Sequence, residues 1–157
     1  MSFVTVPPPS ASPENAEVAG DGFWPSIDVN AMRDELRLGD TVPHARLIAA
    51  IEGGLLTVDG ELADWRAARE GEGITALAEF QPDRTLGGKP RGVLLFTRAV
   101  RFAAAAELAD LHRDMSATAH GQTVAEDERL TAADYRRLCT QAIRDLIGTP
   151  RCTVELI

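Results

Sequence analysis

Long hydrophobic runs are missing from this chain of 157 residues. Hydrophobic residues make up 45% of it, yet no stretch approaches the roughly 18 to 20 apolar residues that a membrane-spanning helix needs. The first residues also lack the basic start and apolar run of a signal peptide, so we expect the chain to stay in the cytosol. The sequence predicts a soluble protein whose length suits one domain around one core.

Cysteine and positive charge are also scarce. The two cysteines, Cys139 and Cys152, match no zinc or redox spacing, and we expect both to be plain buried thiols. Acidic residues number 24 against 16 basic ones, which gives a formal net charge of −8. Because sequence-independent binding of nucleic acid relies on Lys and Arg at the phosphates, this balance argues against a protein that grips DNA.

Patterns typical of catalysis or metal binding are absent as well. The three histidines, His44, His112 and His120, have no partner at metal or triad spacing, and we expect them on the surface. The stretch "TLGGKPRG" resembles part of a phosphate-binding loop, but Pro90 stands where the hydroxyl residue should be. Paired carboxylates fall on faces that solvent should cover. The sequence therefore predicts no enzyme, no cofactor and no metal.

The two ends of the chain differ in composition from its middle. Residues 1–22 carry four prolines and no periodicity, which predicts an extended or disordered N-terminal tail. Its β-prone piece "FVTV", Phe3 to Val6, could dock on a neighbour. We expect a helical domain over 23–148 and an extended, strand-like C-terminal tail over 149–157.

Between the tails the apolar spacing is helical, and we predict an all-α bundle of about five helices. Asp28 is expected to cap a first helix that ends at Gly39. A second begins near Pro43 and should stop at the pair Gly53-Gly54. A third should run from Asp59 to Gly71. Two tryptophans at apolar positions, Trp24 and Trp65, are expected in the core rather than as ligand-stacking residues.

The second half of the domain contains the longest helical pattern. It begins near Val93, ends at Gly121 and carries an alanine run, Ala103 to Ala106, which should let another helix approach closely. Before it lie a brief element at Ile74 to Phe80 and an exposed loop with Lys89 and Arg91, for which an acidic neighbour is one explanation. The last helix should begin at a capping box formed by Thr131 and Asp134 and end at Gly148.

Several strings occur in an order that resembles a known family. "FWPSID", "MRDELRLGDTVPHARLIAAIEGGL", "ELADWR", "LLFTRAV" and "GTPRCTVELI" follow one another from about Phe23 to Ile157. Together they resemble the head completion/stabilisation protein family (GpL) of temperate contractile-tailed phages. The resemblance implies a noncatalytic virion protein of the head-tail neck, assembled in the host cytoplasm, that joins the portal vertex after DNA packaging and prepares it for the tail.

The resemblance also implies a set of partners. It implies an α-helical head-to-tail adaptor in a ring of about twelve copies that matches the portal beneath it. The implied partners are the portal protein, neighbouring copies of the chain, and a tail-terminator or neck protein. Double-stranded DNA would be only passing cargo, and no membrane is involved. An acidic lumen would repel the duplex and let it pass.

Candidate contact residues follow from the resemblance and the apolar pattern together. The final alternating segment is expected to add as a strand to a sheet edge of the portal; its members are Arg151, Cys152, Thr153, Val154, Glu155, Leu156 and Ile157. The long helix is expected to serve both the core and a subunit contact through Phe96, Val100, Ala103, Ala104 and Leu108. The acidic connector with Glu126, Asp127 and Glu128 is expected to face the lumen or the tail side.

Two other functions are weighed against this one. A DNA-associated helical protein of the packaging machinery would need a basic recognition helix, and none is evident. A small helical enzyme would need clustered polar residues in a pocket, which the sequence does not indicate.

Overall fold

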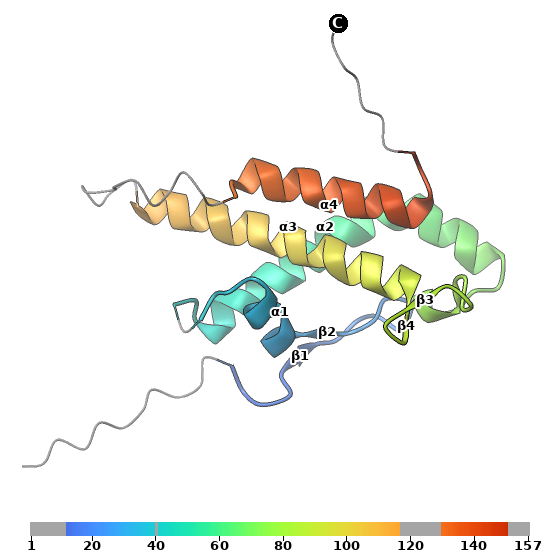
Figure 1. Ribbon diagram of the computed structural model, residues 1–157, viewed down its shortest axis with the longest axis horizontal. Helices are drawn as coiled ribbons and strands as arrows, with labels where there is room; N and C mark the ends of the chain where they lie inside the picture. Colours follow the sequence, from blue (N-terminus) through green and yellow to red (C-terminus); the bar gives the residue numbers. More distant parts are fainter. Residues whose placement is uncertain (1–11, 40, 117–129, 151–157) are drawn as a thin grey trace, which may run out of the picture.

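The computed structural model describes residues 12–39, 41–116 and 130–150, with side chains described up to 111 in the middle range. Four α-helices and two short sheets make up this part (Figure 1). The elements, in chain order, are β1 (Glu17–Val18), β2 (Ile27–Asp28), α1 (Val29–Glu35), α2 (His44–Gly71), the 3-10 helix η1 (Leu77–Glu79), β3 (Thr85–Leu86), β4 (Lys89–Pro90), α3 (Arg91–Ser116) and α4 (Ala132–Ile147).

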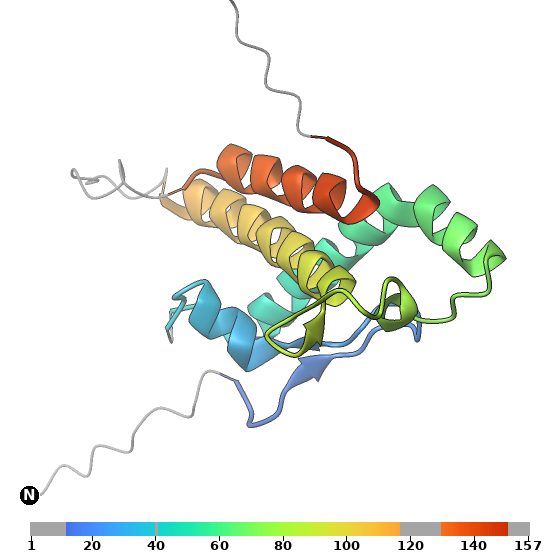
Figure 2. The same cartoon turned by 45° about the vertical axis from the view of Figure 1, so that its right-hand side comes forward.

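Helix α3 lies at the centre of the molecule. It runs beside α4, while α2 crosses it on another side, and the C-terminal turns of α2 extend past the end of α4 (Figures 1 and 2). Its core-facing side chains are largely inaccessible, with Phe96, Val100 and Ala104 at 0% exposure. The predicted long central helix is therefore confirmed, although the fold also holds β-structure and is not purely α-helical.

The second and third predicted helices are one helix. Helix α2 continues for 28 residues through Gly53 and Gly54, which the sequence interpretation took as a stop signal. A Cβ at Gly54 would lie 2.8 Å from the carbonyl oxygen of Val100 and 3.1 Å from the amide nitrogen of Ala104. The glycine is thus a packing residue, because only a bare Cα lets α2 approach the α3 backbone this closely. The expected close approach at the alanine run is confirmed.

Part of the predicted N-terminal tail belongs to the fold. Strand β1 pairs antiparallel with β2, and Val18 is 9% exposed. The amide of Val29 donates to the carbonyl oxygen of Ala16 at 2.9 Å, and Ser12 is also buried. Composition predicted disorder here because the segment has few apolar residues. Two of them, Ala16 and Val18, pack on the core, which offsets the cost of ordering the segment.

The exposed 81–92 loop contains a two-stranded hairpin. Thr85 pairs with Pro90 and Leu86 with Lys89. The turn residues Gly87 and Gly88 have φ values of 56° and 76°, in the left-handed region that a two-residue hairpin turn requires. The side chains of β3 and the turn are exposed as expected, so the hairpin projects from the domain.

The predicted helix caps are confirmed in three places. Asp28 Oδ1 accepts from the amide of Ala31 at 2.8 Å and begins α1, which ends at Glu35, earlier than expected. At α4, Thr131 Oγ1 accepts from the Asp134 amide at 3.2 Å, while Asp134 Oδ2 accepts from the Thr131 amide at 3.0 Å. Gly148 ends α4 with φ at 81°. These caps fix both ends of the helix that precedes the C-terminal segment.

Candidate functional site

The first candidate site is the place where the chain leaves α4, which we call the exit cluster: Arg91, Arg144, Asp145, Gly148 and Pro150. After the left-handed turn at Gly148, the amide of Thr149 donates to the carbonyl of Arg144 at 2.9 Å. The guanidinium of Arg144 in turn donates to the carbonyl of Pro150 at 2.9 Å. The direction in which residues 149 and 150 leave the helix is therefore fixed by hydrogen bonds rather than left open.

Arg91 joins the exit cluster to the rest of the molecule. It is the first residue of α3 and follows the β3–β4 hairpin directly. Its Nη1 and Nη2 lie 3.4 and 3.3 Å from the carbonyl oxygen of Asp145 in the last turn of α4. A cation at a helix C-terminus interacts favourably with the exposed carbonyls. An acidic neighbour of Arg91 stays one possible explanation from the sequence; in the structure Arg91 braces the end of α4.

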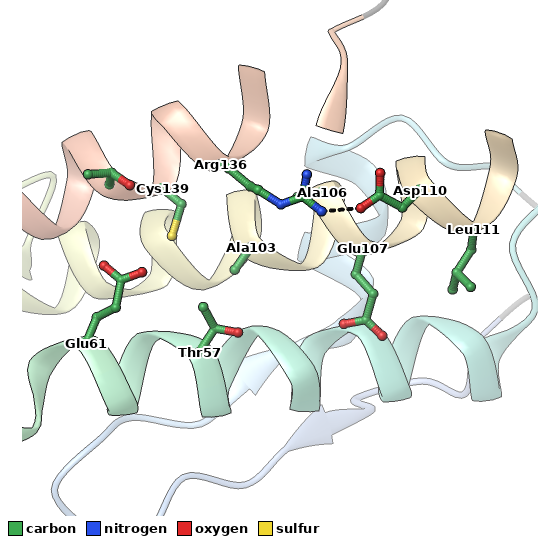
Figure 3. Close-up of a pocket in the computed structure, with 10 residues that line it drawn as sticks. Thr57, Glu61, Ala103, Ala106, Glu107, Asp110, Leu111, Arg136 and Cys139 are labelled. Atoms are coloured by element: carbon green, nitrogen blue, oxygen red, sulfur yellow. Dashed lines mark hydrogen bonds and ion pairs between the residues drawn. The ribbon is translucent and has the colours of Figure 1, made fainter. Parts of the chain in front are cut away.

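A second candidate site is an open groove of about 480 Å³ between α2 and α4, with α3 as its floor (Figure 3). We call it the α2–α4 groove. It is lined by Thr57, Glu61, Ala103, Ala106, Glu107, Asp110, Leu111, Arg136, Cys139 and Thr140. The floor is formed by alanine methyl groups, because the small side chains of α3 that allow close helix packing also leave this space.

Charge in the α2–α4 groove is mostly negative. Glu61 and Glu107 extend into it from α2 and α3, and Arg136 of α4 makes an ion pair with Asp110 (Figure 3). Burial, together with the negative charge of Glu61, raises the pKa of Cys139 to about 11. The thiol is protonated at neutral pH and is a poor nucleophile. The groove offers an acidic surface with an apolar floor.

Arg66 of α2 holds the N-terminal segment in place. Its guanidinium pairs with Asp21, Asp59 and Glu70. The hydrogen bond to Glu70, followed by the hydrogen bond to Asp21 and the charges of both acids, raises the pKa of Arg66 against the opposing effect of burial. The positive charge is thus permanent, and it links the residues before Trp24 to the C-terminal half of α2.

Metal-binding and membrane features are missing from the described residues. No three His, Cys, Asp or Glu side chains in this part of the chain gather in a way that would hold a metal ion. Within residues 12–39, 41–116 and 130–150, each helix is either too short or too polar for a membrane span. What these residues offer is surface for contacts: the exit cluster, the hairpin and the α2–α4 groove.

Comparison with known proteins shows the family to which the chain belongs. The family model described as phage head completion protein (GPL) matches residues 18–157. The chain belongs to this family. Its members are structural parts of a phage head and are not typically enzymes, so membership makes this chain a virion component.

A curated relative supports the same assignment. The head completion/stabilization protein of Escherichia phage P2 is 31% identical over 154 residues, which covers 98% of this chain and 89% of the relative. No solved structure matches the chain. The family resemblance inferred from the ordered strings is thus confirmed, and the match starts at Val18, within the segment that forms β1.

The structure describes one of the three predicted contact sets. Phe96, Val100 and Ala104 are at 0% exposure and Leu108 at 9%, so these side chains pack inside their own chain, while Ala103 is half-buried at the groove. A subunit contact through α3 stays a prediction, and of the five residues named for it Ala103 is the one that is not buried. The portal-docking set 151–157 and the acidic set 126–128 lie outside the described residues.

Other side chains singled out from the sequence are placed as follows. Cys139 is buried, as expected, and Cys152 lies outside the described residues. Trp24 is 5% exposed and confirmed as core, while Trp65 is half-buried and packs edge-on against Phe80 at 5.0 Å. His44 is half-buried rather than exposed, with Nδ1 3.1 Å from the hydroxyl of Ser12, and the other two histidines have no described side chain.

One surface of the molecule was missed in the sequence analysis. Small and apolar residues lie three, four or seven positions apart along the solvent side of α2, with the exposed Glu52 in the seven-residue gap. All of them are exposed: Ala45, Ala49, Leu56, Gly60, Ala63 and Ala67. We call this set the α2 outer stripe. Its period was a usable signal, but splitting α2 at Gly53-Gly54 divided the stripe between two short helices and hid it.

Proposed function

We propose that this chain completes the phage head as an adaptor that binds the portal vertex after DNA packaging, forms a ring there, and prepares it for tail attachment. The observation that carries the proposal is the reach of the family match, which runs to Ile157 and includes the whole C-terminal segment. That segment alternates apolar and polar residues, as a strand that adds to the sheet edge of a partner does.

The exit cluster supports a docking role for residues 151–157. Affinity gained by a docking segment is reduced by the entropy lost when the segment and its attachment are ordered. Arg144 and Gly148 set the path of the chain as far as Pro150, and Arg91 braces the helix end. The attachment of the docking segment therefore loses little entropy on binding. Arg151, the first residue after Pro150, would then contact the portal, and its positive charge would suit an acidic portal surface.

Charge supports a ring through which DNA passes. With a net charge of −8, a ring of about twelve copies is strongly negative, and a lumen lined by carboxylates repels the duplex instead of retaining it. We assign Glu126, Asp127 and Glu128 to the lumen or the tail side. We assign the distal face of the ring to contact with a tail-terminator or neck protein.

Two measurements on the purified full chain test this function. Co-sedimentation with the cognate portal ring should carry the chain into the pellet, and electron microscopy of the pellet should show an added ring on the portal. An electrophoretic shift with duplex DNA at moderate salt should show no complex. A shift without portal binding would refute the adaptor and favour the DNA-associated packaging protein.

A further inference from the structure

The centre of the α2 outer stripe is a leucine that the fold leaves open to solvent. Leu56 is 75% exposed, the largest value among the large apolar side chains that the structure describes. One turn further along, a Cβ added to Gly60 would meet no atom within 4 Å. The middle of α2 therefore presents an apolar side chain beside a position with no side chain. Small residues at a contact let the axes of two helices approach closely.

Helix α2 is apolar on opposite sides. Its inner side carries the fully buried Leu47, Ile51, Val58 and Leu62, which is enough to hold the helix on α3. The α2 outer stripe adds a second apolar face that contributes nothing to this packing. Surface helices normally carry polar residues opposite the core, whereas on α2 the charged residues Arg46, Glu52 and Asp64 only flank a strip of small and apolar ones.

We propose that the outer stripe binds a second copy of this chain, with the two α2 helices antiparallel and a two-fold axis beside Leu56. Ala49 and Ala63 lie equally far from Leu56 in opposite directions along the helix, and so do Ala45 and Ala67. In this arrangement each alanine faces an alanine of the second copy, and the two leucines meet at the centre. A two-fold contact requires a surface that is complementary to itself in this way.

Charge favours the antiparallel direction. Arg46 and Asp64 are both exposed, and their spacing of 64 − 46 = 18 residues is about five helical turns, so they lie on the same flank of α2. Antiparallel pairing about Leu56 brings Arg46 of one copy beside Asp64 of the other at both ends of the contact. Parallel pairing would instead bring the two copies of Glu52, an exposed residue of the same face, against each other.

The size of the contact predicts a weak, reversible dimer. From Ala45 to Ala67 the stripe is about 33 Å long, and with a width of about 10 Å it buries roughly 700 Å² over both copies. Stable interfaces bury about 1,200 Å² or more, so we expect a dissociation constant in the micromolar range. A contact of this strength covers the apolar face of the free chain and gives way when stronger contacts form, as in assembly on a portal.

Sedimentation of the full chain at increasing concentration tests the dimer. We expect a monomer–dimer equilibrium, and Leu56→Lys should raise its dissociation constant more than about tenfold, because the central apolar contact is replaced by two like charges. Leu86→Lys is the matched control, since Leu86 is 71% exposed at the tip of the hairpin and lies outside the stripe. A chain that stays monomeric at all concentrations would overturn the proposal, and so would equal effects of the two substitutions.

Cross-linking tests the direction of the pair in a Cys152→Ser background. Leu56→Cys should form a disulfide between copies, whereas Ala49→Cys alone should not, because its two copies lie about 21 Å apart along the pair. Mixing the Ala49→Cys and Ala63→Cys chains should restore cross-linking. Asp64→Arg should weaken the dimer, and Arg46→Asp in the same chain should recover it. Cross-linking by Ala49→Cys alone would show a parallel contact and refute the arrangement.

Discussion

The indole of Trp24 stacks on the ring of Phe96, with 4.4 Å between centroids and 7° between planes. The same indole donates from Nε1 to Oδ1 of Asp59 at 2.6 Å. One side chain near the start of the domain thus contacts both α3 and α2. This double contact explains why the segment before α1 is part of the fold.

Replacing Trp24 tests how much this contact stabilises the domain. Trp24→Ala should lower the free energy of unfolding by about 3 to 5 kcal/mol, through lost burial and the cavity left beside Phe96. Trp24→Phe keeps a ring but removes the indole donor to Asp59, which retains only its longer ion pair with Arg66, and should cost less, about 1 to 3 kcal/mol. Urea unfolding followed by circular dichroism measures both. Equal midpoints for Trp24→Ala and the unaltered chain would contradict a core role.

Two glycines of α2 should respond to alanine in opposite ways. Gly54→Ala places a Cβ 2.8 Å from the Val100 carbonyl oxygen, so the helices must separate, and we expect a loss of about 1 to 3 kcal/mol. Gly60→Ala meets open space within a helix and should gain up to about 1 kcal/mol. Thermal unfolding at low micromolar concentration compares them. Similar shifts in the same direction would contradict the packing role of Gly54.

Acid should destabilise the domain partly through Asp21. Partial burial opposes ionisation, but hydrogen bonds from the amide of Trp24 and from Arg66 outweigh it and lower the pKa of Asp21 in the folded chain. A lowered folded pKa contributes stability above the unfolded value of about 4, and this stability is lost as pH falls through the folded pKa. Asp21→Asn should therefore reduce the drop in melting temperature between pH 5 and pH 2.5. An unchanged drop would contradict this contribution.

The thiol of Cys139 should be slow to alkylate near neutral pH. Burial and Glu61 raise its pKa to about 11, so few thiolates exist at pH 8. In a Cys152→Ser chain, iodoacetamide labelling followed by mass spectrometry should accelerate up to about pH 11. Glu61→Gln, which removes the nearby negative charge, should shift this profile to lower pH. Labelling at pH 8 as fast as that of a free thiol would contradict the buried position.

Local signals were enough to predict some of these elements but not others. The caps at Asp28, Thr131 and Gly148 are set by residues within one turn, so sequence alone located them. Gly53-Gly54 and the β1 segment could not be assigned in this way. The conformation of Gly54 depends on α3, far along the chain, and that of β1 depends on its pairing with β2. From the local sequence alone, the glycine pair was interpreted as a helix stop and the β1 segment as part of a disordered tail.

The candidate sites show the same division. The exit cluster joins Arg91 to Asp145 across 54 positions, and the α2–α4 groove exists only because α2 and α4 meet on α3 without filling the space between them. Neither can be inferred from spacing along the chain. The family could be inferred, because it depends on the order of strings rather than on how they pack.

The central claim is that the C-terminal segment holds the chain on the portal. The most direct measurement is the affinity of the cognate portal ring for the full chain and for a chain that ends at Pro150, with circular dichroism as a control for folding. We predict that the shortened chain remains helical and folded, because the exit cluster and α4 are intact, and that its binding to the portal is lost. Equal affinity of the two chains would contradict the claim.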